Sequence, residues 1–186
     1  MIDKIMTNKL YIANILLLCA LTYLLNYCTT IYQCALVFTI IAITVNIMTV
    51  MGGRFKSLTG LVSAIIISFA FLWKLPYYID GRLVNSLVVA SFLSLIISLY
   101  FAVSAFARFY SRFGFVIANA LSLGIAAIID GFVMGLFFVI NNNFSYARIM
   151  DIFSRELSYK IFYGVLASAI IFAALKLLNN KIKAIV

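Results

Sequence analysis

Apolar residues in this chain come in long uninterrupted runs that are separated by short polar breaks. Each run is close to the roughly 20 residues that an α-helix needs to cross about 30 Å of hydrocarbon. The runs that we interpret as transmembrane helices are 10–30, 34–52, 57–73, 84–107, 113–140 and 160–178. The pattern therefore predicts an all-α, polytopic membrane protein, a compact bundle of six transmembrane helices that forms one domain over residues 1–186.

Polar residues mark the predicted breaks, which are short at 52–56, 74–82 and 108–112. The break at 141–159 is longer and rich in Asn, Ser and charge. Its stretch "FSYARIMDIFSREL" has apolar residues close to one helical face, which are Phe144, Ile149, Ile152 and Phe153. That spacing favours an interfacial helix over a loop, and we expect this segment to act as a lid or an anchor.

Composition supports the membrane prediction, because 66% of the 186 residues are apolar and 10% are charged, whereas a soluble domain is about half apolar. The net charge of +9 comes from scattered basic residues. With a cytoplasmic N-terminus, the inner side holds Lys4, Lys9, Arg54, Lys56, Arg108, Arg112, Lys176, Lys181 and Lys183. The outer side then holds Lys74, Arg82, Arg148, Arg155 and Lys160. The excess of basic residues on the inner side predicts an inner (plasma) membrane protein with both termini cytoplasmic. Because the basic residues are scattered between the membrane runs, they argue against nucleic-acid binding.

Several kinds of enzyme are excluded by what the chain lacks. It has no histidine and only three cysteines, with no clustered Cys, Asp and Glu. A zinc or iron centre and a histidine-based triad therefore have no ligands or base. We predict no enzyme activity, no metal and no cofactor. Cys28 and Cys34 flank the first predicted outer turn, and the sequence leaves open whether they pair.

One carboxylate, Asp130, interrupts the apolar run 122–138, "SLGIAAIIDGFVMGLFF". An ionisable residue at that depth costs about 2.5–3.5 kcal/mol on insertion scales and usually faces a cavity or a partner. At helical spacing Asn119 shares its face and Ser122 lies to one side. Asn46 lies on a similar polar face of the second run. Asp130 is either a functional acid in a ligand or ion pathway or a structural acid bonded to a neighbouring helix.

Two further patterns occur at helical spacing. Glu156 and Lys160 are four residues apart with the acid first, which fits either a surface ion pair or contact with a polar solute. Small side chains recur at three- and four-residue steps in the fourth run, at Ser91, Ser94, Ser98, Ala102 and Ala105. Such a stripe favours close packing of another helix.

Three of these stretches, in order and spacing, resemble the queuosine-precursor transporters, a family of vitamin-uptake type. They are "ASFLSLIISLYFAVSAF" (90–106), "NALSLGIAAIID" (119–130) and "ELSYK" (156–160), with a weaker match over "TIIAITVNIMTVMGGRFKS" (39–57). Asn119, Leu121, Ser122 and Asp130 match the fifth-helix signature, and Glu156 and Lys160 stand where the family tends to have an acid and a lysine. The chain departs from the family at three polar positions, which here are Val45, Ala102 and Ala118.

The resemblance implies a substrate like a 7-deazaguanine base with an aminomethyl or related substituent. Asp130 would accept the paired N–H groups of the base or balance a protonated amine. Asn119, Ser122 and Asn46 would supply hydrogen bonds, and Glu156 and Lys160 would contact the solute. The predicted function is import of a queuosine precursor across the inner membrane, by a central site that opens alternately to each side.

Two alternatives remain. The chain has about the size and helix count of a substrate-binding subunit of an energy-coupling-factor type vitamin importer, which would need an ATPase module and would dock through the small-residue stripe. It also fits a structural membrane scaffold, in which Asp130 only packs helices. Beyond the bilayer, the candidate partners are a nucleobase-like small molecule, a second copy of the chain and, in the first alternative, the ATPase module.

Overall fold

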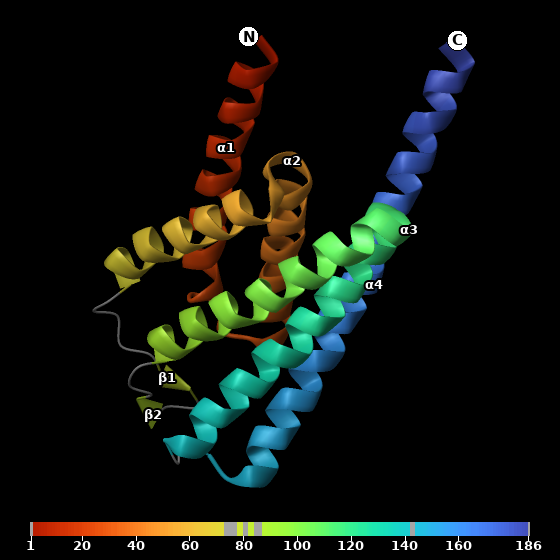
Figure 1. The fold of residues 1–186 in the computed structure, drawn as a ribbon. Coiled ribbons are helices and arrows are strands. Elements are labelled where there is room, and N and C mark those ends of the chain that lie inside the picture. The colour runs from red at the N-terminus through yellow and green to blue at the C-terminus, as the bar shows by residue number, and fades with distance from the viewer. Residues whose placement is uncertain (1, 73–77, 80–81, 84–86, 142–143, 186) are drawn as a thin grey trace.

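The protein is described here by a computed structural model (Figure 1). It describes the backbone of residues 2–72, 78–79, 82–83, 87–141 and 144–185, and the side chains of residues 9–72, 87–141 and 144–177. Parts of the topology prediction lie outside these ranges: Pro76, and the side chains of Lys4, Lys74, Arg82, Lys181 and Lys183.

Helices make up nearly all of the described chain. They are α1 (Ile2–Leu25), α2 (Ile31–Leu72), α3 (Leu87–Ile140) and α4 (Tyr146–Ile185). Between α2 and α3, the two-residue strands β1 (Tyr78–Ile79) and β2 (Arg82–Leu83) pair antiparallel. The expected all-α class is therefore confirmed for the described residues, with this short ladder as an addition.

Glycines divide the two longest helices. α2 is broken at Gly53 (φ 80°, ψ 167°) and α3 at Gly114 (φ 74°, ψ −179°). Both φ values lie in the region that glycine enters readily and other residues avoid. Figure 1 shows that α2 and α3 each fold back on themselves, and the non-helical residue inside each is its glycine, so both are helical hairpins. The described chain thus contains six helical segments, α1, the two halves of α2, the two halves of α3, and α4.

The observed boundaries correct three expectations. The predicted break at 52–56 narrows to Gly53, because the helix resumes immediately after it. The predicted break at 108–112 is helical, and the chain turns at Gly114 instead. From Tyr146 onward the predicted break at 141–159 belongs to α4, which continues through the predicted sixth run and is therefore not a separate interfacial helix.

Among the residues that the structure describes, three helices are long and apolar enough to cross a membrane: α2, α3 and the part of α4 from Tyr146 to Leu177. In α1 the apolar stretch Lys9–Leu25 is shorter. Large apolar side chains lie exposed along the outside of the bundle, for example Phe71 at 73% and Phe132 at 62%. An apolar exterior of this extent marks a membrane protein, because lipid accepts a surface that water disfavours.

The packing order follows the chain. α1 packs on α2, α2 on α3 and α4, and α3 on α4. The core between them is apolar, and its fully buried members include Leu18, Ile41, Met48, Leu61, Leu95, Leu99 and Val103. Thr22 of α1 is buried, and its hydroxyl lies 2.7 Å from the Ser68 hydroxyl of α2. A buried polar contact therefore joins α1 to the second half of α2.

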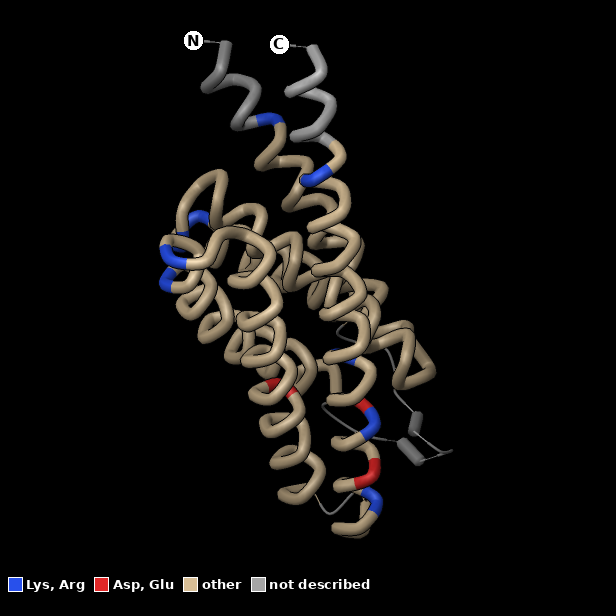
Figure 2. Tube along the Cα trace, turned by 90° about the vertical axis from the view of Figure 1, so that its right-hand side faces the viewer, with Lys and Arg blue, Asp and Glu red and all other residues tan. Residues whose placement is uncertain are grey.

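Both termini lie at the same end of the molecule (Figures 1 and 2). The bends of α2 and α3 lie towards that end, and the strands β1 and β2 lie towards the opposite end. In Figure 2 the coloured residues near the termini and the glycine bends are Lys and Arg, and the described Asp and Glu lie in the other half. The molecule is thus asymmetric in charge along its length.

Candidate functional site

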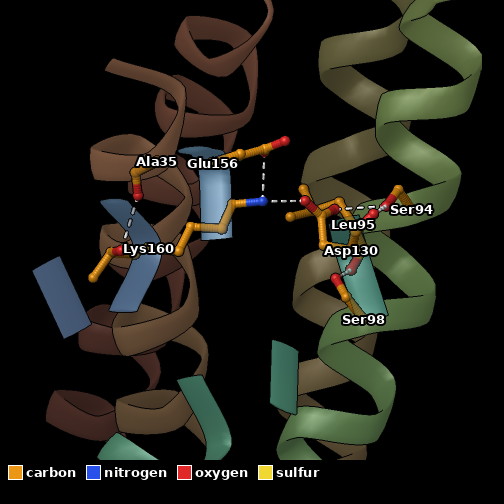
Figure 3. A network of polar contacts seen from close by, with 8 residues as sticks. Ala35, Ser94, Leu95, Ser98, Asp130, Glu156 and Lys160 are labelled. Atoms are coloured by element: carbon orange, nitrogen blue, oxygen red, sulfur yellow. Dashed lines mark hydrogen bonds and ion pairs between the residues drawn. The ribbon is translucent and has the colours of Figure 1, made fainter. Parts of the chain in front are cut away.

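Asp130 lies at a junction of three helical segments (Figure 3). It belongs to the second half of α3 and is only 6% exposed. The Ser94 hydroxyl, from the first half of α3, donates a hydrogen bond of 2.6 Å to Asp130 Oδ1. Lys160 of α4 donates to the other carboxylate oxygen, Oδ2, and forms an ion pair with it. Both oxygens of the buried acid are therefore bonded.

Lys160 is the centre of the polar contacts. Its Nζ lies 2.6 Å from Glu156 Oε1, one turn earlier in α4, and 4.2 Å from the centre of the Phe38 ring in α2. Lys160 is 3% exposed, and the Glu156 side chain is 19% exposed. Charge-assisted hydrogen bonds and a cation–π contact replace water around the ammonium group. The interpretation of Glu156 and Lys160 as a surface pair is wrong, because Lys160 lies inside the bundle, about four turns into α4.

The charges of this cluster do not cancel. With all three groups ionised, Asp130 and Glu156 carry two negative charges and Lys160 carries one positive charge. Ser94 adds a neutral donor. A buried charge is tolerated where it is paired and hydrogen-bonded, and here two carboxylates share one ammonium group. The cluster is therefore suited to hold a further cation or a ligand with several N–H donors.

A second polar cluster joins α2 to α3. Asn46 Nδ2 donates hydrogen bonds of 2.9 Å to Asn119 Oδ1 and 2.8 Å to Ser122 Oγ, and all three residues are at most 2% exposed. Asn119 Nδ2 is buried and has no hydrogen-bond partner. An unbonded buried donor costs about 1–3 kcal/mol. Asn119 Nδ2 can therefore donate a hydrogen bond to a carbonyl oxygen or to a water molecule.

The six predicted site residues form these two clusters and not a single one. Asp130 and Glu156 both form ion pairs with Lys160, whereas Asn46 donates hydrogen bonds to Asn119 and Ser122. Asn119 precedes Asp130 by eleven positions in the same helical segment, which places their Cα atoms roughly 16 Å apart along the axis. A molecule the size of one base cannot touch both clusters at once.

Two side chains at the Asp130 cluster were not predicted as site residues. Ser94 was assigned to the packing stripe, and Ser94, Ser98 and Ala102 of that stripe are indeed buried. The spacing of the stripe did not predict that Ser94 would donate a hydrogen bond to Asp130. Phe38 is one of many aromatic residues in apolar runs, and only the structure distinguishes it by placing its ring against Lys160.

The three cysteines form no disulfide: Cys19, Cys28 and Cys34 are all free thiols. Cys34 Sγ lies 3.8 Å from the Cys28 carbonyl oxygen, so the two are neighbours without a disulfide. Burial raises the pKa of the Cys28 thiol, which lies in the turn between α1 and α2. Within the part of the chain that is described, no group of three or more His, Cys, Asp and Glu side chains could hold a metal ion.

Comparisons with protein-family models, with curated proteins and with solved structures find no match to this chain.

Proposed function

We propose that this protein is a membrane transporter that imports a queuosine precursor, a 7-deazaguanine-type base, across the inner membrane. The Asp130–Lys160–Glu156 cluster with Ser94 is the substrate site, and the polar residues around Asn119 line the same pathway. The protein is not an enzyme in this proposal, and its partner is the small molecule that it carries.

The proposed topology has six membrane spans with both termini in the cytoplasm. Six helical segments that alternate in direction support it, as do the shared end of the two termini and the position of the glycine bends. Arg54 and Lys56 follow the bend at Gly53, and Arg108 and Arg112 precede the bend at Gly114. An excess of basic residues beside short loops is typical of the cytoplasmic side.

The buried Asp130 is the observation that carries the proposal. Its carboxylate lies well inside an apolar bundle, and its partners come from the other half of α3 and from α4. A membrane protein keeps an ionisable group at such a position chiefly where it serves a substrate or ion pathway. A carboxylate also matches the adjacent N–H donors of a guanine-like edge, which fits the substrate class that the family resemblance implies.

The proposal is tested in bacteria that can neither make nor import the precursor, with queuosine in tRNA as the readout. Cells that express the chain and receive the precursor should regain the modified base. Asp130→Asn should abolish the gain, because it removes the charge while it keeps the size of the side chain. Asp151→Asn is the matched control, since Asp151 is an acid of α4 whose side chain is 36% exposed and pairs with Arg155. This control should import normally.

The same assay separates the alternatives. If the inserted wild-type chain restores no queuosine, the substrate assignment is wrong, and an importer subunit that needs an ATPase module becomes the better account. If import survives Asp130→Asn unchanged, Asp130 only packs helices. The small-residue stripe argues against the importer-subunit alternative, because Ser94, Ser98 and Ala102 are buried within this chain and leave no docking face there.

A further inference from the structure

Two cysteines lie close together where the chain passes from α1 to α2. Cys28 is in the turn that follows α1, and Cys34 is in the first turn of α2. The Cys34 Sγ lies 3.8 Å from the carbonyl oxygen of Cys28, and the two thiols are within hydrogen-bonding reach of each other. Both side chains are partly accessible and unpaired. The two sulfur atoms are therefore adjacent and open to an oxidant, as formation of a disulfide requires.

Cys34 also lies beside the polar contacts of Lys160. It precedes Phe38 by four residues, so both side chains project from the same face of α2. The Phe38 ring contacts Lys160 of α4. The Cys34 thiol is itself near enough to Glu156 and Lys160 to interact with both charges. A change in the covalent state of Cys34 therefore acts directly next to the contact between α2 and α4.

The proposed topology places the turn after α1 in an oxidising compartment. The N-terminus is cytoplasmic in that topology, and α1 is the first of the six spans, so the chain reaches the outer side before Cys28. Disulfides form and persist outside the inner membrane, whereas thiols on the cytoplasmic side are kept reduced. Cys28 and Cys34 thus meet an oxidant where they meet each other.

We propose that Cys28 and Cys34 form a reversible disulfide that braces the outer end of α2 beside the Lys160–Glu156 ion pair. The oxidant is a disulfide compound or protein. One cysteine thiolate attacks it and forms a mixed disulfide, and the other then attacks that mixed disulfide. The oxidant is reduced to two thiols, which take up the two protons that the cysteines lose. The proposal rests on the proposed function only for the topology, because this chemistry needs no substrate.

Mass spectrometry of the purified, reduced protein tests the disulfide directly. After exposure to oxidised glutathione in detergent, the wild-type chain should lose the mass of two hydrogen atoms and carry no glutathione. Its one alkylatable thiol should be that of Cys19, and a dithiol reductant should restore all three. Cys19→Ser should form the same disulfide, whereas Cys28→Ser should form none. A wild-type chain that keeps three alkylatable thiols, or that only accumulates glutathione adducts, overturns the inference.

The disulfide should also stabilise the protein. A cross-link restricts the unfolded chain, so the oxidised wild-type protein and oxidised Cys19→Ser should each have a higher Tm than their reduced forms. Cys28→Ser should keep the Tm of the reduced wild-type protein, which shows that this variant fails to form the disulfide although it is folded. An oxidised wild-type protein with an unchanged or lower Tm would contradict the bracing role.

The rate of disulfide formation tests whether the cysteines lie beside the ion pair. The thiolate is the attacking species, and a nearby carboxylate disfavours it by charge repulsion. Glu156→Gln should therefore form the disulfide severalfold faster than the wild-type protein. Asp151→Asn, which neutralises a more exposed acid of the same helix, should react at the wild-type rate. Equal rates in all three proteins would overturn the link between the disulfide and the ion pair.

Labelling in intact cells separates this inference from the transport proposal. In cells that express Cys19→Ser, a membrane-impermeant maleimide should label the chain only after a membrane-impermeant phosphine has reduced the disulfide. Labelling that needs no phosphine, or that needs permeabilised cells, would overturn the inference even if the precursor is imported. Labelling that depends on the phosphine, in cells that import no precursor, would overturn the transport proposal and leave the disulfide standing.

Discussion

At the scale of single residues, Asp130 shows what a carboxylate requires inside an apolar bundle. Both of its oxygens are bonded, one to the Ser94 hydroxyl and the other to Lys160. Loss of one partner from a buried ion pair costs about 3–5 kcal/mol, because the remaining charge is uncompensated. The Lys160–Asp130 pair therefore joins α4 to the second half of α3, and the Ser94–Asp130 hydrogen bond joins the two halves of α3.

Gly131, next to Asp130, allows α3 and α4 to approach closely. A Cβ atom at Gly131 would lie 2.6 Å from Cε2 of Phe153 in α4. Gly131→Ala should therefore displace the Phe153 ring and lower the stability. Gly124→Ala is the matched control, because a Cβ there meets nothing within 4 Å and both changes gain the same helix propensity.

The free energy of unfolding of Gly131→Ala should be lower than that of Gly124→Ala by about 1–3 kcal/mol, the usual cost of overpacking. Unfolding by denaturant in detergent measures both variants. Equal stabilities would show that α3 and α4 are not packed through Phe153 as described.

The site could be predicted only in part from single positions. The helical period placed Asn119 and Ser122 on the inward face with Asp130, and all three are buried. The helical period could not predict which helix each of these residues would contact, because their hydrogen-bond and ion-pair partners are distant in sequence. Lys160 was expected at a membrane surface, because the sixth membrane run was predicted to begin at residue 160, whereas α4 begins at Tyr146 and buries Lys160.

At the scale of elements, the glycine at each helix break decides where the chain turns. Gly114 has a φ of 74° and open space around its Cα, so Gly114→Ala tests the backbone conformation alone. An L-residue in this region costs about 1–2 kcal/mol. Gly114→Ala should lower the free energy of unfolding by about that amount relative to the wild-type protein, measured in the same denaturant series. No difference would mean that α3 does not turn at Gly114.

The elements themselves were largely predictable. Runs of apolar residues of membrane-crossing length identified the helical segments, because lipid requires both the length and the composition. The breaks were less predictable. The basic residues Arg108 and Arg112 suggested a loop, yet they lie in helix, and the turn depends on the one residue nearby that tolerates a positive φ.

At the scale of the whole molecule, the charge asymmetry and the polar clusters give the proposed transporter a direction and a path. Basic residues gather near the termini and the glycine bends (Figure 2). Asn119 lies close after the Gly114 bend, and Asp130 lies about three turns further along the same segment. A substrate that moves between the two clusters would travel roughly half the thickness of the hydrocarbon.

Uptake into liposomes that contain only the purified chain tests the central claim most directly. The labelled aminomethyl 7-deazaguanine should enter with saturable kinetics through the wild-type protein and through Asp151→Asn. Liposomes with Asp130→Asn should take up no more than empty liposomes. If wild-type protein that is folded and inserted gives only the rate of empty liposomes, the chain is not a transporter of this base on its own.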